Sequence, residues 1–241
     1  MWNPLLYTLL GLMVGALVGL TGVGGGSVMT PILVLAFGQS PAVAVGTDLM
    51  FSASTKLVAT AAFGFSRRVD WRIVARLLLG SAPAAGAVIL WLWLHHGSPG
   101  AVDQLITRCL AVILALAAAA LLFYDPLRRL GLKFTVSWLR GTERYQVALT
   151  VAAGLLLGFG VAMTSVGAGV LGVVALAALY PLRLPADRLV ATDIAHALPI
   201  TAIAAVGHAG LGHVDLRLPP QFTRTLIAIM LAVVSGRLFV T

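Results

Sequence analysis

The chain has 241 residues, of which 60% are hydrophobic and 10% are charged, and its mean hydropathy is +1.01. A soluble globule of this size cannot bury so many apolar side chains, so we expect an integral membrane protein. The formal net charge of +8 could suggest a nucleic-acid partner, but the arginines lie in loops between apolar runs, as the positive-inside rule predicts for membrane proteins. We therefore expect the lipid bilayer, and no nucleic acid, as a partner of this chain.

Most of the apolar runs are about as long as a membrane-spanning helix, and none shows the two-residue period of a barrel strand. These longer runs are 3–20, 41–63, 71–94, 105–124, 146–163, 186–209 and 221–240. Ser40 followed by Pro41 is typical of a helix start, with a serine cap and proline at the first helical position. The sequence therefore predicts an all-α, polytopic helical bundle.

Two shorter runs, 28–38 and 170–180, reach only about halfway across the bilayer, because 11 helical residues span about 16 Å. Each follows a break in the helical pattern, Thr21-Gly-Val-Gly-Gly-Gly-Ser27 in one case and Thr164-Ser-Val-Gly-Ala-Gly169 in the other. Glycine disfavours helix, so we predict broken or re-entrant half helices, the first capped by Ser27. Their free amide ends attract anions, and two such ends meeting near the midplane would form one anion site.

The two halves of the chain match each other in order, which indicates an internal duplication. Beyond the two breaks, the matching pairs are Ser40-Pro41 with Leu184-Pro185, Thr47-Asp48 with Thr192-Asp193, Arg68-Val-Asp70 with His213-Val-Asp215, and Thr107-Arg108 with Thr223-Arg224. We divide the chain into a first membrane repeat (1–125), a basic cytoplasmic linker (126–145) and a second membrane repeat (146–241). The second repeat is shortened by one helix, because the residues between Asp215 and Arg224 are too few to cross a bilayer.

Arginines predict the orientation of the bundle. The loop 65–76 and the linker are rich in arginine, whereas the loop 95–103 is not, so the first two are expected on the cytoplasmic side. If each glycine break turns the chain back, Arg183 and Arg188 also lie inside and the repeats are inverted, as in many secondary transporters. If the breaks do not turn the chain, the repeats are parallel and these arginines face outward.

Several ionisable residues fall inside apolar runs, where a charge is costly and therefore suggests function. Asp48 and Asp193 lie at similar depths in the two halves, and Lys56 is placed to find its partner on another helix. A neutral carboxylic acid beside an anion site would suit coupling to protons. The alternative is a structural ion pair, or side chains that snorkel to an interface.

Histidines and serines are the residues that could bind a metal or act in catalysis. Asp193 and His196 share a helical face, but no third ligand is evident, so we expect a hydrogen-bonded core histidine, no metal and no other cofactor. His208 and His213 end apolar runs and are expected to be solvated. No serine has a base at a useful spacing, so the chain is not expected to be an enzyme.

The chain contains Gly19-Leu-Thr-Gly-Val-Gly-Gly-Gly-Ser27 with Pro31, Val45-Gly-Thr-Asp48, Arg68-Val-Asp70-Trp71 and Val190-Ala-Thr-Asp-Ile-Ala-His196. Together these segments resemble the sulfite exporter TauE/SafE family, also called toluene sulfonate uptake permeases. The resemblance covers nearly the whole chain. It implies a multi-pass permease of the bacterial inner membrane that moves sulfite, sulfonates or related anions. The family pattern places a further helix after the second Val-Asp turn, which this chain lacks after Val214-Asp215.

We thus expect a secondary permease for a small, sulfur-containing or organic anion. A homodimer is one assembly that such a permease could form. The residues expected to bind the anion are the glycine breaks, nearby hydroxyls and a lysine: Gly24, Gly25, Gly26, Ser27, Thr47, Lys56, Thr164, Ser165, Gly167, Gly169 and Thr192. Proton or ion coupling is assigned to Asp48, Asp193 and His196. The alternatives are a cation or metal permease that uses these last three residues, and a membrane scaffold that transports nothing.

Overall fold

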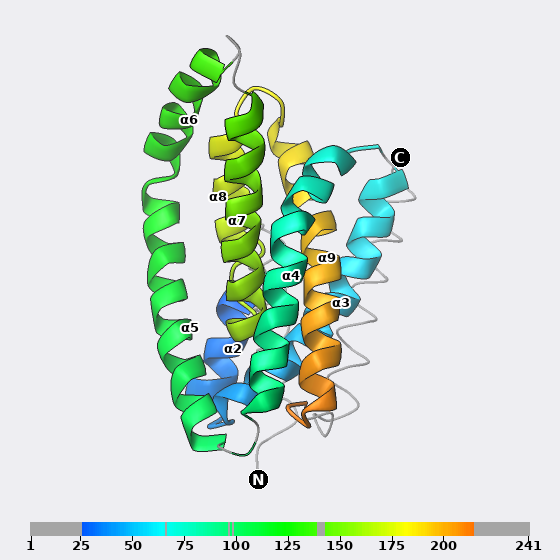
Figure 1. The fold of residues 1–241 in the computed structure, drawn as a ribbon, viewed down its shortest axis with the longest axis vertical. Coiled ribbons are helices and arrows are strands. Elements are labelled where there is room, and N and C mark those ends of the chain that lie inside the picture. Colours follow the sequence, from blue (N-terminus) through cyan, green and yellow to red (C-terminus); the bar gives the residue numbers. More distant parts are fainter. Residues whose placement is uncertain (1–25, 66, 96, 98, 139–142, 215–241) are drawn as a thin grey trace.

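The computed structural model describes residues 26–65, 67–95, 97, 99–138 and 143–214, and every regular element within these ranges is an α-helix (Figure 1). The helices are α2 (Gly26–Leu35), α3 (Pro41–Phe65), α4 (Trp71–Leu94), α5 (Pro99–Leu122), α6 (Tyr124–Trp138), α7 (Glu143–Thr164), α8 (Val170–Leu179) and α9 (Ala186–Gly210). Four of them, α4, α5, α7 and α9, are long and apolar enough to cross a membrane. The all-α class is confirmed, while the runs 3–20 and 221–240 lie outside the described residues.

Helix boundaries follow the local signals in the sequence. α3 begins at Pro41, directly after Ser40, and α4 occupies the predicted range 71–94. Both short runs form helices of 10 residues, α2 and α8. The prediction for Ser27 is wrong, because this residue lies inside α2 rather than before it and so does not cap it.

The segment between the two predicted repeats also forms a helix. α6 carries Arg128, Arg129 and Lys133 on its exposed surface. Gly131 lies on its buried side, and a Cβ atom there would overlap the carbonyl group of Ala178 at the end of α8. The linker therefore packs against a half helix instead of only joining the two halves.

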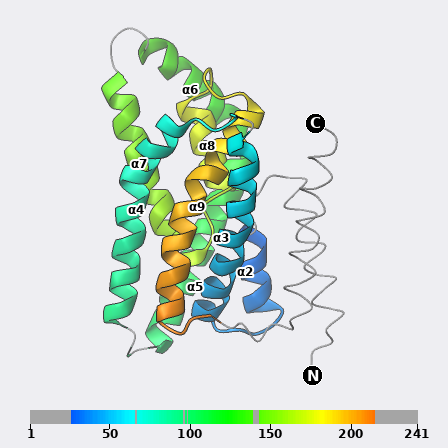
Figure 2. The ribbon, with the colours of Figure 1, turned by 90° about the vertical axis from the view of Figure 1, so that its right-hand side faces the viewer.

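The two half helices start near the middle of the molecule and run to opposite ends (Figures 1 and 2). α2 descends to the lower end of Figure 1, from which α3 returns upward, whereas α8 rises to the upper end, from which α9 descends. We call the upper end, with residues 67–70 and 180–185, the Arg183 end. We call the lower end, with residues 36–40, 99–103 and 211–214, the Asp103 end.

A bidentate ion pair between loops far apart in the sequence stabilises the Arg183 end. Arg183 donates from Nε to Asp70 Oδ2 at 2.8 Å and from Nη2 to Asp70 Oδ1 at 3.0 Å. Asp70 also caps α4 by accepting from Ile73 N at 3.3 Å. Three arginine-bearing segments, which are the α3–α4 turn, the start of the linker and the loop 180–185, lie toward this end (Figure 1), whereas Arg108 lies in the first half of α5, nearer the other end.

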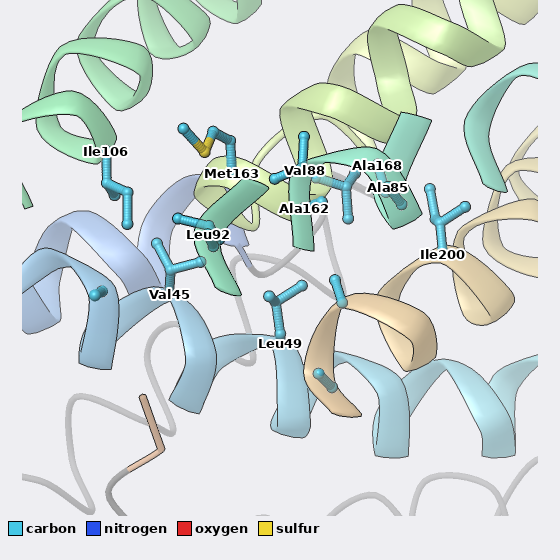
Figure 3. Close-up of a cluster of buried hydrophobic side chains, with 14 of the residues drawn as sticks. Val45, Leu49, Ala85, Val88, Leu92, Ile106, Ala162, Met163, Ala168 and Ile200 are labelled. Atoms are coloured by element: carbon cyan, nitrogen blue, oxygen red, sulfur yellow. The ribbon is translucent and has the colours of Figure 1, made fainter. Parts of the chain in front are cut away.

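The main hydrophobic core lies where α3, α4, α7 and α9 meet, with α5 closing one side (Figure 3). Val45 and Leu49 of α3 face Leu92 of α4, Met163 of α7 and Ile200 of α9 in this cluster. Beside it, α4 and α7 approach so closely that Cβ atoms at Gly154 and Gly158 would overlap the carbonyl groups of Leu77 and Ser81. Small residues spaced by four positions permit this contact, as is common between helices in membranes.

Candidate functional site

The turn that precedes α8 lies against the start of α2. A Cβ atom built on Gly26 would overlap the carbonyl group of Ser165 and would lie 3.0 Å from the Ser165 hydroxyl oxygen. Since α2 and α8 both begin here and run away in opposite directions, their N-terminal ends belong to one central region (Figure 1). The residues 22–25, which include the predicted site residues Gly24 and Gly25, lie outside the described part of the chain.

The 164–169 turn owes its shape to residues that accept unusual backbone angles. Gly167 and Gly169 have φ angles of +129° and +105°, which residues other than glycine rarely adopt, and Ser165 has a φ angle of +60°. Thr164 supports the turn, because its hydroxyl donates to Gly160 O at 2.8 Å and accepts from Val166 N at 3.2 Å. These bonds give Thr164 a structural task in this conformation.

Asp48 lies in this region and is held by a side chain of the first half helix. The Thr30 hydroxyl donates to Asp48 Oδ2 at 2.7 Å, and only 2% of Asp48 is exposed. The Ser165 hydroxyl lies close enough to influence the Asp48 carboxyl group, yet it makes no hydrogen bond of good geometry to any group in the described ranges. A buried hydroxyl in that position is available to a ligand.

Asp193 is held by the backbone of the second half helix. Its Oδ2 accepts from Gly169 N at 2.9 Å, at the N-cap of α8, and its exposure is also 2%. Its Oδ1 has no hydrogen-bond partner among the described residues. A Cβ atom on Gly172 would overlap Oδ1, so the carboxyl group lies directly against the first turn of α8.

Lys56 supplies a positive charge to both carboxyl groups. It lies on α3, two turns after Asp48, and interacts electrostatically with Asp48 and with Asp193. Neither interaction is an ion pair within 4.0 Å, since the ion pair found in the described residues is that of Arg183 with Asp70. The expectation that Lys56 has a partner on another helix is therefore supported by its interaction with Asp193 of α9.

His196 is a fully buried histidine, with one ring nitrogen bound and one without a partner in the described structure. Its Nε2 lies 2.9 Å from the Ser81 hydroxyl of α4, and its Nδ1 has no partner. It lies one turn after Asp193 on α9. No group of three or more potential metal ligands is found in the ranges that the structure describes.

Other predicted site residues point elsewhere or lie at the edge of this region. The Thr192 hydroxyl accepts from Asp70 N at 3.1 Å and is thus turned toward the Arg183 end. Thr47 is fully buried in α3 and takes part in further interactions, as does Ser27 in α2. The structure therefore brings together Gly26, Asp48, Ser165, Gly169 and Asp193, and we call this group the central polar cluster.

Two contributors to the region were not predicted as site residues. Thr30, the hydroxyl-bearing residue in the apolar run 28–38, binds Asp48, and Ser81 binds His196. An isolated polar residue within an apolar run was the available signal for Thr30. Ser81 is likewise an isolated polar residue in the apolar run 71–94, but the packing of α4 against α9, which brings it to His196, has no local signal.

The prediction that His208 is solvated is wrong. Its side chain is fully buried, with Nε2 placed 3.0 Å from Ala162 O and Nδ1 placed 3.4 Å from His213 Nδ1. The reason is that α9 packs against α7 at this depth, so the last turn of α9 is covered although it ends an apolar run. His213 lies beyond α9, where partial burial lowers the pKa of its imidazole and the nearby Asp103 partly offsets this.

Comparison with known proteins places this chain among membrane transporters. The family model described as "Sulfite exporter TauE/SafE" matches residues 7–241. The chain is 37% identical over 213 residues to the "Probable membrane transporter protein YjnA" of Bacillus subtilis (strain 168), covering 87% of this chain and 81% of that protein. No solved structure matches.

Proposed function

The chain belongs to the sulfite exporter TauE/SafE family of membrane transporters, and we propose that it moves a small sulfur-containing oxyanion, such as sulfite or a sulfonate, across the bacterial inner membrane. The observation that carries this proposal is the meeting of the α2 start with the turn before α8. Two buried polar atoms without hydrogen-bond partners of good geometry in the described structure lie in or beside this turn: Ser165 Oγ next to Gly26, and Asp193 Oδ1 against the first turn of α8. Membership of a transporter family argues against the scaffold alternative.

An oxyanion fits the groups that meet there. Amide groups at a helix N-terminus attract negative charge, and a hydroxyl and an ammonium group add directed and charge-assisted interactions. Gly169 and Ser165 supply the first two kinds of donor, and Lys56 supplies a positive charge within electrostatic reach. Several oxygens on one small anion could use all three, which favours sulfite or sulfonate over a halide.

We further propose that the two halves form an inverted repeat and that the Arg183 end faces the cytoplasm. The opposite directions of α2 and α8, and of α3 and α9, support the inversion (Figure 2). The gathering of arginines at one end supports the orientation by the positive-inside rule. Rocking of one half against the other about a central site is the usual mechanism of such transporters.

Asp48 and Asp193 are proposed to couple transport to protons. A carboxyl group buried at membrane depth is costly as an isolated charge, so it either pairs or takes up a proton. Lys56 is one cation shared by two such groups, which leaves a proton as the means to neutralise the second. Binding of an anion and binding of a proton would then favour each other.

Flux into proteoliposomes tests this function directly. Purified protein is reconstituted, and uptake of radiolabelled sulfite, sulfate, methanesulfonate and thiosulfate is measured at several pH values. We expect uptake of at least one sulfur oxyanion and loss of its pH dependence in Asp48→Asn or Asp193→Asn. Lys133→Thr, on the exposed surface of α6, is the control for a general loss of positive charge.

A cation permease is the second candidate, because one observation favours it. Asp193 Oδ1 and His196 Nδ1 both lack partners in the described structure, are buried and lie one turn apart on α9. Carboxylate oxygen and imidazole nitrogen are common metal ligands. Uptake of a divalent cation that sulfite does not affect would favour this function and contradict the anion proposal.

A further inference from the structure

The N-terminus of α8 already holds a negative group, which comes from another helix. Gly169, the N-cap residue, has no side chain with which to cap the helix, and its amide group instead donates to Asp193 Oδ2 at 2.9 Å. The second carboxyl oxygen lies against Gly172 in the first turn. The place that the helix dipole makes favourable for an anion is thus filled by Asp193 of α9.

A second buried polar group lies in the turn that leads into α8. Ser165 is only 4% exposed and lies four residues before Gly169, and its hydroxyl lies near the Asp48 carboxyl group but makes no hydrogen bond of good geometry in the described ranges. The residue adopts a positive φ of 60°, which is unusual for serine and places the side chain beside the start of α2. A buried hydroxyl without a partner is costly, so a bound group that pairs with it would be stabilised.

We propose that the carboxylate of Asp193 is an internal competitor of the transported anion. In the conformation described here it occupies the amide end of α8, and the anion binds by displacing it and by accepting hydrogen bonds from Gly169 N and Ser165 Oγ. The displaced side chain moves toward the positive charge of Lys56, with which it already interacts. This inference rests on the proposed function and assigns Asp193 as the residue that sets the affinity for the anion.

Asp48 offers the matched contrast. Its carboxyl oxygen is bound by the Thr30 side chain, with no backbone amide at a helix start among its hydrogen-bond donors in the described structure. Lys56 of α3 interacts electrostatically with Asp193 and also with Asp48 of its own helix, His196 lies one turn after Asp193 on α9, and α8 contributes no charged or titratable group. Removing the charge of Asp48 therefore changes the local potential without vacating the amide end of α8.

The test is equilibrium binding of radiolabelled sulfite to the full chain in lipid nanodiscs, measured by scintillation proximity. We expect Asp193→Asn to bind sulfite about tenfold more tightly than the wild type, because a partly buried charge at a helix end contributes an interaction of about that size, while Asp48→Asn tightens binding less. Gly172→Ala keeps the acid but places a Cβ atom where Oδ1 lies, so it should also tighten binding. Circular dichroism and size-exclusion chromatography establish that each variant is folded.

The outcomes separate this inference from the proposed function. Folded Asp193→Asn protein with unchanged or weaker sulfite binding overturns the inference while the transport proposal stands. Equal tightening in Asp48→Asn also overturns it, because the effect would then come from net charge alone. If neither the wild type nor any variant binds sulfite, sulfate, methanesulfonate or thiosulfate, the proposed function falls and the inference falls with it.

Discussion

The two halves of the central polar cluster use the same aspartate in different ways. In the first half, Asp48 accepts from the side chain of Thr30 on α2, whereas in the second half Asp193 accepts from the backbone of Gly169 at the start of α8. The sequence match that pairs Gly26 with Gly169 pairs Thr30 with Val173, which has no hydroxyl. Two matching sequence segments therefore hold their acids differently, one by a side chain and the other by the backbone amide at the start of a half helix.

The difference extends along the two long helices that carry these acids. Eight residues after Asp48 stands Lys56, whereas eight residues after Asp193 stands Thr201, whose hydroxyl donates to Ala197 O and Leu198 O of its own helix. At the preceding turn, Gln39 occupies the position that Arg183 occupies in the second half. The first half thus provides the lysine at the centre, and the second half provides the arginine of the ion pair at the Arg183 end.

The largest effect is expected from a substitution that separates the two half helices. Gly26→Val places side-chain atoms where the carbonyl group of Ser165 lies, and backbone cannot easily move away. We expect a loss of about 3 kcal/mol or more in stability, seen as a lower thermal unfolding temperature in detergent. Gly86→Val on the exposed face of α4, where a Cβ atom meets nothing within 4 Å, is the control and should change little. Equal unfolding temperatures for the two variants would show that the contact is not required.

Lys56→Thr gives the first long helix the residue that the second has at the matching position. It removes the positive charge that Asp48 and Asp193 share. Since a charge-assisted interaction contributes about 1.5–3 kcal/mol, we expect anion flux into proteoliposomes to fall by at least about tenfold. Lys56→Arg should retain part of the flux, because it keeps the charge with a different shape. Unchanged flux in a folded Lys56→Thr protein would remove this residue from the site.

Thr30→Val makes the first half helix like the second at the position of Val173. The Asp48 carboxyl group loses its 2.7 Å hydrogen bond in a fully buried setting. We expect a loss of about 1–3 kcal/mol in stability, whereas Thr30→Ser should retain most of it, because serine keeps the hydroxyl. Chemical unfolding in mild detergent measures both. Similar losses for valine and serine would indicate that packing of the methyl group, rather than the hydrogen bond, matters here.

Arg183→Gln makes the second loop like the first at the position of Gln39, and it has the smallest expected effect. Its ion pair with Asp70 is bidentate, but the Arg183 side chain is 41% exposed, so water screens the charges. We expect a loss of only about 0.5–1 kcal/mol, which salt in the buffer should reduce further. Asp70→Ala should cost more than Arg183→Gln, because it also removes the cap of α4. The reverse order would contradict the assigned roles.

Much of this protein follows from its sequence alone. The apolar runs predicted the helices, because a bilayer leaves backbone groups no partner except one another. The glycine breaks predicted two short helices, and Ser40-Pro41 predicted the start of α3. Each of these is a local property, set by residues within one or two turns of each other. The inverted arrangement of the repeats and the roles of the site residues stay predictions.

Only the tertiary structure decided which of these elements touch. Four features depend on segments that are far apart in the chain. They are the contact of Gly26 with Ser165, the hydrogen bonds of Thr30 with Asp48 and of Ser81 with His196, and the burial of His208. No local pattern fixes them, because a side chain in a membrane helix can face lipid or a neighbouring helix with nearly the same apolar sequence around it. The two matching aspartates show both contributions: the sequence already differs where Thr30 matches Val173, but only the packing of each half helix brings a donor to its aspartate.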